Sequence, residues 1–127
     1  MSYLLDTCAL IWLGMGGGDL SEDARKRISV ASALHYSAIS AWEIARLQGE
    51  GKIVIPSTPD GFLSDLVDQY GLSAIPPTDG IMIRAAQLPM HHRDPADRII
   101  IATSLVHDLI IVTGDEKFAQ YGVRTIC

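Results

Sequence analysis

The feature that most restricts the fold of this chain is a short apolar run, Leu109-Ile110-Ile111-Val112, with a helical pattern before it. A run of this kind is typical of a strand that is buried on both faces of a sheet. The helical segment begins with a good N-cap, Asp94, followed by Pro95 at the first helical position. From Ile99 to Val106 it is apolar on most sides, as expected of a helix packed against a sheet. A helix followed by a doubly buried strand indicates a parallel α/β arrangement.

The same alternation of strand and helix runs along the whole chain. Strands are predicted at residues 3–5, 35–39, 72–75, 109–112 and 123–125, with a brief extended segment at 52–55. Helices are predicted at 7–13, from 21, at 40–48, 59–70 and 81–88, and from 95. We therefore predict an α/β fold in which a parallel β-sheet is sandwiched by α-helices. At 127 residues the chain is expected to form one domain, residues 1–127.

Composition narrows the setting in which the protein works. The chain is 48% hydrophobic and 20% charged, which is typical of a globular domain. A net charge of −5 disfavours a protein that coats nucleic acid through a broad positive potential, but it is compatible with a nuclease whose acids bind cations. No apolar run approaches the ~18–20 residues of a membrane span, and the first residues lack a signal-peptide pattern. With only Cys8 and Cys127, we expect a reducing, cytoplasmic location and no membrane contact.

Four acidic residues are predicted to meet at one edge of the sheet. Asp6 and Asp115 follow strands directly, whereas Glu43 and Asp97 lie in the first turns of helices. In a parallel α/β fold the helices run opposite to the strands, so helix starts and strand ends share one edge, where such folds place their sites. Any one of these acids alone is explained by a cap or a turn. The convergence of four indicates a binding site.

Crowded carboxylates need a compensating cation, because like charges a few ångströms apart raise each other's pKa. Carboxylate and water oxygens suit Mg²⁺ or Mn²⁺, and no Cys or His stands at a spacing typical of zinc. Such a site suits phosphoryl chemistry, since the metal orients the phosphate and lowers the pKa of the attacking water. The predicted cofactor is therefore Mg²⁺, with Mn²⁺ as the other candidate.

Four motifs carry a resemblance to a known family. They are Asp6-Thr7 after the first strand, Ser40-Ala41-Trp42-Glu43-Ile44, Arg93-Asp94-Pro95-Ala96-Asp97-Arg98 and Thr113-Gly114-Asp115-Glu116-Lys117-Phe118. In order and spacing they resemble the PIN-domain ribonucleases, and most of all the VapC toxins of bacterial and archaeal toxin–antitoxin pairs. The resemblance covers essentially the whole chain.

The resemblance implies roles for the residues at these positions. Asp6, Glu43, Asp97 and Asp115 would form the acidic site that binds the metal, with Asp6 and Asp97 as direct Mg²⁺ ligands. Thr113 would support the site through its hydroxyl, and Thr7 stands beside Asp6. The implied activity is that of a Mg²⁺-dependent endoribonuclease that hydrolyses RNA phosphodiester bonds.

The resemblance also implies partners for the protein. Toxins of this type are silenced by a small antitoxin that blocks the acidic pocket, and they form homodimers. Apolar helix segments at residues 10–13 and 44–47 are the predicted dimer surface.

The basic residues give weaker predictions about RNA contact. Chains of this type often carry a basic residue four positions after the helix glutamate, where Leu47 stands here, so Arg46 is the candidate. Arg93 is a second candidate. Arg98 is a third, although it stands at the right spacing to pair with Asp94 instead.

Several other side chains have a structural and a functional interpretation. His92 is a candidate for contacting RNA, but the pair His91-His92 fits a solvated loop better. Trp12 and Trp42 fit a core or an interface better than a platform for stacking bases. Ser40 is interpreted as a helix cap, because no base stands beside it to make it a nucleophile.

Two other functions are open to a chain with this pattern. A phosphotransferase that works through an aspartyl phosphate would need an acid two residues after Asp6, where Cys8 stands. A PIN-like module that binds RNA or a partner without cutting is the second alternative, and loss of some of the four acids would favour it. All four are present.

Overall fold

Five short strands form one parallel sheet in the computed structural model, which describes residues 1–127. The strands are β1 (Ser2–Leu5), β2 (Ala33–Ser37), β3 (Leu72–Ile75), β4 (Ile110–Val112) and β5 (Thr125–Ile126). Their order in the sheet is β3-β2-β1-β4-β5, and every neighbouring pair is parallel. The central strand β1 thus lies between one strand that follows it closely in sequence and one from the far end of the chain.

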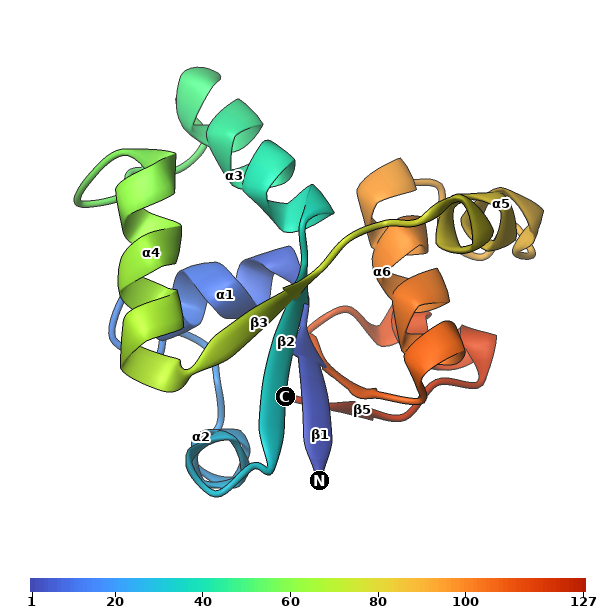
Figure 1. Cartoon of the computed structure of the whole chain (residues 1–127), viewed down its shortest axis with the longest axis horizontal. Helices are drawn as coiled ribbons and strands as arrows, with labels where there is room; N and C mark the ends of the chain where they lie inside the picture. Colours follow the sequence, from blue (N-terminus) through green and yellow to red (C-terminus); the bar gives the residue numbers. More distant parts are fainter.

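Helices cover both faces of this sheet (Figure 1). They are α1 (Thr7–Gly14), α2 (Glu22–Ser29), α3 (Ile39–Gly49), α4 (Pro59–Tyr70), α5 (Asp79–Gln87), α6 (Pro95–His107) and a 3₁₀ helix, η1 (Glu116–Tyr121). Figure 1 shows α1 and α4 on one side of the sheet and α6, with α5 against it, on the other. The prediction of a parallel sheet sandwiched by helices is confirmed.

Alternate residues of the central strands supply the two halves of the core. Tyr3 and Leu5 of β1 point to the larger apolar cluster, which includes side chains of α1, α2 and α4. Leu4, between them, packs with Ile100 and Ile101 of α6 in the second cluster. Since a strand turns successive side chains to opposite faces, each short strand is anchored from both sides. Each large aliphatic side chain that is fully buried contributes about 1.5–3 kcal/mol.

The start of α3 differs from its prediction. The helix begins at Ile39, and the residue before it, Ala38, makes no side-chain cap. Ser40, predicted as the cap, is fully buried inside the helix, where its hydroxyl lies 2.9 Å from that of Thr7. Because the helix starts earlier than predicted, Glu43 lies beyond the first turn. The position of Ser40 is therefore explained by its contact with α1, and not by capping of its own helix.

Smaller corrections concern the strand limits. The second strand is Ala33–Ser37, where residues 35–39 were predicted, and the last is Thr125–Ile126, where 123–125 were predicted. The segment at 52–55 is not a strand. The sequence pattern of one strand does not show where the strand begins or ends, because these limits depend on hydrogen bonding to the neighbouring strands.

Only part of the predicted dimer surface on α1 and α3 is accessible, because Ile11, Ala45 and Leu47 are partly or fully exposed but three other side chains are buried, so the surface stays a prediction. Leu10 and Ile44 are fully buried, and Leu13 packs in the same core cluster. These side chains hold the two helices to the sheet and are not free to meet a second copy.

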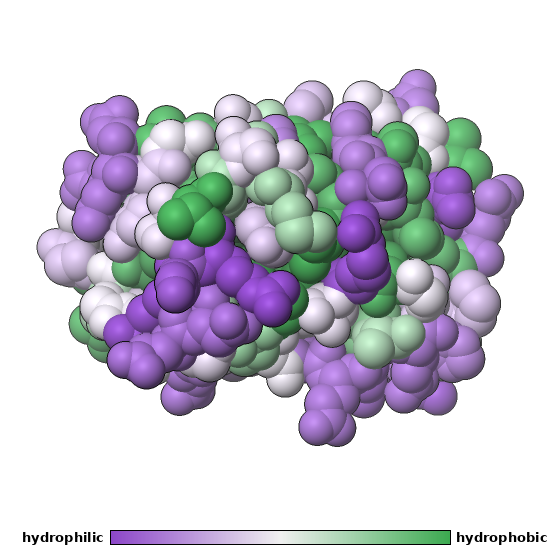
Figure 2. Space-filling view, turned by 90° about the horizontal axis from the view of Figure 1, so that it is seen from below, coloured by the Kyte–Doolittle hydropathy of each residue, from purple (hydrophilic) through white to green (hydrophobic).

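The face at the amino ends of the strands is seen in Figure 2, which views the molecule from below. Hydrophilic side chains cover much of it, and apolar residues lie between them in separate patches. None of the helices has the length and apolar character needed to cross a membrane. The other end of the sheet, where the strands finish, holds the predicted acidic residues.

Candidate metal-dependent active site

Asp6 links the central strands to the start of α1. Its backbone N–H donates to the Val112 carbonyl at 3.0 Å, continuing the pairing of β1 with β4. Its side-chain Oδ1 caps α1 by accepting from the N–H of Ala9 at 2.8 Å. Burial raises the pKa of this carboxyl to about 6, although hydrogen bonds from Thr113 and Ala9 oppose the shift. Asp6 is therefore both a structural cap and a carboxylate that is costly to ionise.

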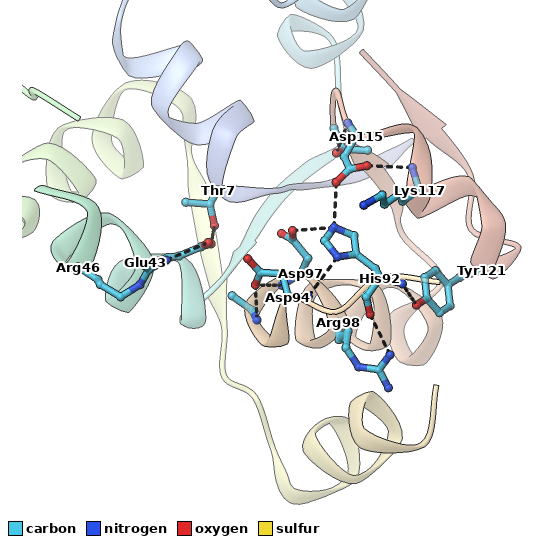
Figure 3. A network of polar contacts seen from close by, with 12 residues as sticks. Thr7, Glu43, Arg46, His92, Asp94, Asp97, Arg98, Asp115, Lys117 and Tyr121 are labelled. Carbon is cyan, nitrogen blue, oxygen red and sulfur yellow. Dashed lines mark hydrogen bonds and ion pairs between the residues drawn. The ribbon is translucent and has the colours of Figure 1, made fainter. Parts of the chain in front are cut away.

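Glu43 reaches the site from α3 and is held by α1. The Thr7 hydroxyl donates to Glu43 Oε1, and Figure 3 shows the two side chains pointing toward one another. Glu43 Oε2 lies 3.9 Å from an Arg46 nitrogen. Burial is the main cause that raises the pKa of Glu43, and the hydrogen bond from Thr7 opposes it. Thr7 thus fixes the direction of a buried carboxylate, which supports its predicted accessory role.

Asp97 lies in the first turn of α6, as predicted. Asp94 caps this helix by accepting from the backbone N–H groups of Ala96 and Asp97 at 2.9 and 3.3 Å, and Pro95 takes the first helical position. The pKa of Asp97 is raised to about 8, first by burial and then by the charges of Asp94 and Glu43, with smaller contributions from Asp6 and Asp115. Without a cation nearby, this carboxyl holds a proton at neutral pH.

His92 occupies a different place from the one predicted for it. It is buried, not part of a solvated loop, and its Nε2 lies 2.8 Å from Asp115 Oδ2 and 3.0 Å from Asp97 Oδ2. The Asp94 N–H donates to its Nδ1 at 3.2 Å, so the proton of the neutral ring resides on Nε2 and faces the two carboxylates. The Tyr121 hydroxyl and the Phe118 ring hold the rest of the residue.

Asp115 completes the site from the turn after β4. Its N–H donates to the Thr113 hydroxyl at 3.1 Å, and its Oδ1 caps η1 by accepting from the N–H of Lys117. These two contacts leave Oδ2 pointing to His92 and Asp97 (Figure 3). Thr113 is buried and contacts both Asp6 and Asp115, so the accessory role predicted for it fits its position.

Three of the four predicted acids, Asp6, Asp97 and Asp115, line a cleft of about 540 Å³, and Glu43 is not among its lining residues. Its lining residues are Asp6, Cys8, Trp12, Asp97, Gly114, Asp115, Glu116 and Lys117. Ligand atoms of His92, Asp97 and Asp115 lie within 4.8 Å of one another, and so do those of Glu43, Asp94 and Asp97. Asp97 belongs to both groups, which makes it the centre of the site.

The donor set fits a hard divalent cation. Carboxylate oxygens predominate, and Mg²⁺ and Mn²⁺ prefer oxygen ligands. Burial is the main cause that raises the pKa values of Asp6, Glu43 and Asp97, and neighbouring acids add to it, so a bound cation would favour their ionised forms. Asp94 was predicted only as a cap, and its spacing gave no sign that it lies within reach of Glu43 and Asp97.

Arg98 does not have the role that was predicted for it. It is only 7% exposed, and it points away from the cleft. Its two terminal nitrogens donate to backbone carbonyls of residues 85, 86, 88, 89 and 92. These contacts tie the end of α5 and the following loop to α6, so the side chain cannot reach RNA. Nor does it pair with Asp94.

The other two arginines lie away from the cleft lining. Arg46 donates to Glu50 at 2.9 Å and lies over the ring of Trp42, 5.3 Å from its centroid. Arg93 borders a separate hollow of about 250 Å³ between α5 and α6. Of the two arginines, Arg46 is the one near the acidic site, because it contacts Glu43.

Comparison with known proteins gives the family. The family model described as PIN domain matches residues 3–123. The chain is 30% identical over 121 residues to Ribonuclease VapC22 of Mycobacterium tuberculosis, an alignment that covers 94% of this chain and 92% of the relative.

Solved structures share the fold. The chain resembles VapBC2 from Rickettsia felis bound to a DNA fragment from the promoter, with a TM-score of 0.74 at 15% identity, covering 99% of this chain and 98% of that one. For the DNA-bound VapBC from Salmonella typhimurium the TM-score is 0.71 at 20% identity, covering 99% and 97% of the two chains. The sequence match and the shared fold agree with the acidic site at the ends of the strands: the chain belongs to the PIN domain family and is a VapC-type member of it.

Proposed function

We propose that this protein is a Mg²⁺-dependent endoribonuclease that hydrolyses RNA phosphodiester bonds. The observation that supports this most directly is the position of Asp97, shared between two groups of potential ligands and protonated at neutral pH unless a cation is near. A site that is short of positive charge binds cations and, through them, phosphates. The ribonuclease to which the chain is 30% identical supports RNA as the substrate.

The residues divide the work by position. Asp97 and Asp6 would hold the metal, and Glu43 and Asp115 would complete its coordination or bind its waters. A bound Mg²⁺ supplies orientation of the phosphate and a lowered pKa for the attacking water. The carboxylates accept the proton of that water.

Two further contacts keep these carboxylates in place. Thr7 directs Glu43 through its hydroxyl, and the Nε2–H group of His92 directs both Asp97 and Asp115. These hydrogen bonds order the ligands before the metal arrives, which lowers the cost of binding it. His92 is therefore a positioning residue in this proposal, not an RNA contact.

We also propose that the protein is the toxin of a type II toxin–antitoxin pair, silenced by a small cognate antitoxin and acting as a homodimer in the cytoplasm. Two of the similar solved structures, those from Rickettsia felis and Salmonella typhimurium, are VapBC assemblies, which supports a protein partner. A cationic side chain of such a partner would satisfy the same charge deficit that a metal does. A monomeric mass in light scattering would count against the homodimer.

Cleavage of RNA with a matched pair of variants tests the proposed activity. Total RNA is incubated with purified protein in Mg²⁺, in chelator, and with Asp97→Asn, which keeps size but removes a ligand charge. Asp108→Asn is the control, because Asp108 ends the same helix, is 96% exposed and has a left-handed conformation that asparagine adopts readily. Discrete cuts by wild type and Asp108→Asn, absent with chelator and with Asp97→Asn, are expected.

Other outcomes separate the alternatives. Cutting that persists in Asp97→Asn would reject the site as assigned. RNA binding by folded wild type with no cutting in Mg²⁺ or Mn²⁺ would favour the non-cleaving PIN-like module.

A further inference from the structure

Two lining residues of the acidic cleft have no part in holding a metal. Trp12 comes from α1 and Lys117 from η1, and both border the same cleft as Asp6, Asp97 and Asp115. Trp12 follows Cys8 by four residues, so the two side chains share one face of α1, and both line the cleft. Trp12, predicted to lie in a core or an interface, packs against the core and also lines the cleft.

Two glycines hold the Trp12 indole in place. A Cβ atom on Gly114 would lie 2.8 Å from Cη2 of the ring, and one on Gly18 would lie 2.8 Å from Cδ1. The indole thus fits between two backbone segments that come close only because neither carries a side chain. The ring is partly buried against the main apolar cluster, and part of it remains at the cleft. A ring fixed in this way loses little side-chain entropy when a ligand stacks on it.

Lys117 brings a positive charge to the same cleft. Its backbone N–H is bound by Asp115 Oδ1, and Figure 3 shows its ammonium turned back toward the acidic cluster. Its ammonium makes no ion pair within 4.0 Å, although carboxylates of Asp115 and Glu116 are close in sequence. The amine is thus free to pair with a phosphate brought into the cleft.

The two side chains and the volume of the cleft suit one unpaired nucleotide. The cleft of about 540 Å³ lies within the range of about 300–1,000 Å³ usual for small-molecule sites. An aromatic ring binds the face of a base, and a base can offer its face only where it is not stacked in a duplex. The acidic residues form the proposed reaction centre. Trp12 and Lys117 lie beside it in the same cleft.

Resting on the proposed ribonuclease function, we propose that Trp12 stacks on the base of an unpaired nucleotide beside the scissile phosphate and that Lys117 binds that nucleotide's phosphate. Stacking tolerates any base, so this contact selects unpaired structure more than sequence.

Tryptophan fluorescence tests the stacking directly. Trp12 and Trp42 are the only tryptophans, and Trp42 is 58% exposed on α3, so Trp42→Phe leaves Trp12 as the single reporter. Asp97→Asn is added to prevent cleavage during titration. An oligouridylate is the probe, and a blunt RNA duplex of the same length is its comparison. The single strand is expected to quench Trp12 emission, and the duplex is not.

Binding affinities of matched variants give the second readout. A stacked base contributes about 1–3 kcal/mol, so Trp12→Leu should weaken binding of the single strand about 5- to 150-fold, Trp12→Phe less, and Trp42→Leu not at all. Lys117→Ala should lower the slope of log K against log salt by about 0.7, whereas the exposed Lys26 of α2, changed to Ala, leaves it unchanged. Thermal unfolding confirms that each variant is folded, and Trp12→Phe keeps most of the packing if Trp12→Leu does not fold.

The outcomes distinguish this proposal from the function on which it rests. Single-stranded RNA that binds without quenching Trp12, and equally well to wild type and Trp12→Phe, overturns the stacking while leaving the nuclease intact. Equal binding of duplex and single strand overturns it too. No RNA binding and no cleavage by wild type in Mg²⁺ would reject the nuclease and the stacking together.

Discussion

Asp97 and Arg98 are neighbours in the first turn of α6, but their charged groups have opposite kinds of surroundings. The guanidinium of Arg98 is buried and donates to five backbone carbonyls. Burial, and then the charges of four other acids, raise the pKa of the Asp97 carboxyl to about 8. Arg98 is satisfied by the fold itself, whereas the fold gives the Asp97 carboxyl one hydrogen bond, from the His92 ring, among several acids. A buried charge with all its partners indicates structure, and one without them indicates a binding site.

The largest effect on stability is expected from removing the satisfied charge. Arg98→Ala leaves carbonyls at the end of α5 without donors and opens a space beneath α6, so the free energy of unfolding should fall by about 3–5 kcal/mol. Urea denaturation followed by circular dichroism measures it. Arg93→Ala, an exposed arginine in the same loop, is the control and should change stability by less than about 0.5 kcal/mol. Equal effects would mean that the carbonyl contacts of Arg98 do not hold this region.

Substitution of the neighbouring residue, Asp97, should raise the free energy of unfolding instead of lowering it. The folded protein raises the pKa of Asp97 from 3.8 to about 8, so the ionised carboxylate opposes folding. This penalty is absent below about pH 4, grows between about pH 4 and 8, and is constant at higher pH. Asp97→Asn should therefore stabilise the metal-free protein at pH 9 by about 2–5 kcal/mol, or about 3–6 °C for each kcal/mol, and cause little change at pH 4. Metal-free wild type that is more stable than Asp97→Asn at pH 9 would contradict the assignment.

Bound Mg²⁺ should remove the free-energy cost of ionising Asp97, and the affinity for Mg²⁺ should depend on pH. Since Asp97 and Asp6 carry protons up to about pH 8 and 6, Mg²⁺ must displace them, and its affinity should rise by up to about tenfold per pH unit for each proton released. The rise should continue to about pH 8 and then level off. Calorimetric titration in buffers of different ionisation enthalpy counts the protons. An affinity that is constant between pH 6 and 8 would show that Asp97 is not a ligand, and one that is also constant below pH 6 would show the same for Asp6.

A smaller effect is expected from the contact of His92 with the carboxylates of Asp97 and Asp115. His92→Ala removes the donor shared by Asp97 and Asp115, whereas His92→Gln keeps a donor at a similar reach. We expect metal affinity to fall about 10- to 100-fold in the alanine variant, with partial recovery in the glutamine variant. Thermal shift against Mn²⁺ concentration measures both, and the remote His107→Ala serves as control. Equal affinities in all three would leave His92 a purely structural residue.

Sequence patterns predicted the architecture and the four acids because both depend on local signals. Strand and helix periods are read from neighbouring residues, and topology alone brings Asp6, Glu43, Asp97 and Asp115 to one edge. The same patterns missed the positions of His92 and Arg98, and they did not show that Trp12, which packs against the core as predicted, also lines the cleft. The sequence around a loop histidine, an arginine near an acid or a tryptophan in an apolar helix does not show the surroundings of the side chain. Each pattern is the same whether the side chain is exposed to solvent, buried with hydrogen-bond partners or lining a cleft. Only contacts with residues far along the chain, such as Asp115 for His92 and Gly114 for Trp12, decide among these.

The position of β1 in the sheet links the folding of this protein to its activity. β1 lies between β2, which follows it closely in sequence, and β4, which comes more than a hundred residues later. Asp6 is beside β1 and Asp115 follows β4, so the carboxylates meet only after this distant pairing has formed. Contacts between residues far apart in sequence form slowly, because the loop between them must close first. A partly folded or nascent chain can therefore have the strands and helices of its first half in place and still have no active site. For a protein proposed to act as a toxin, this topology means that the active site forms only when folding is nearly complete.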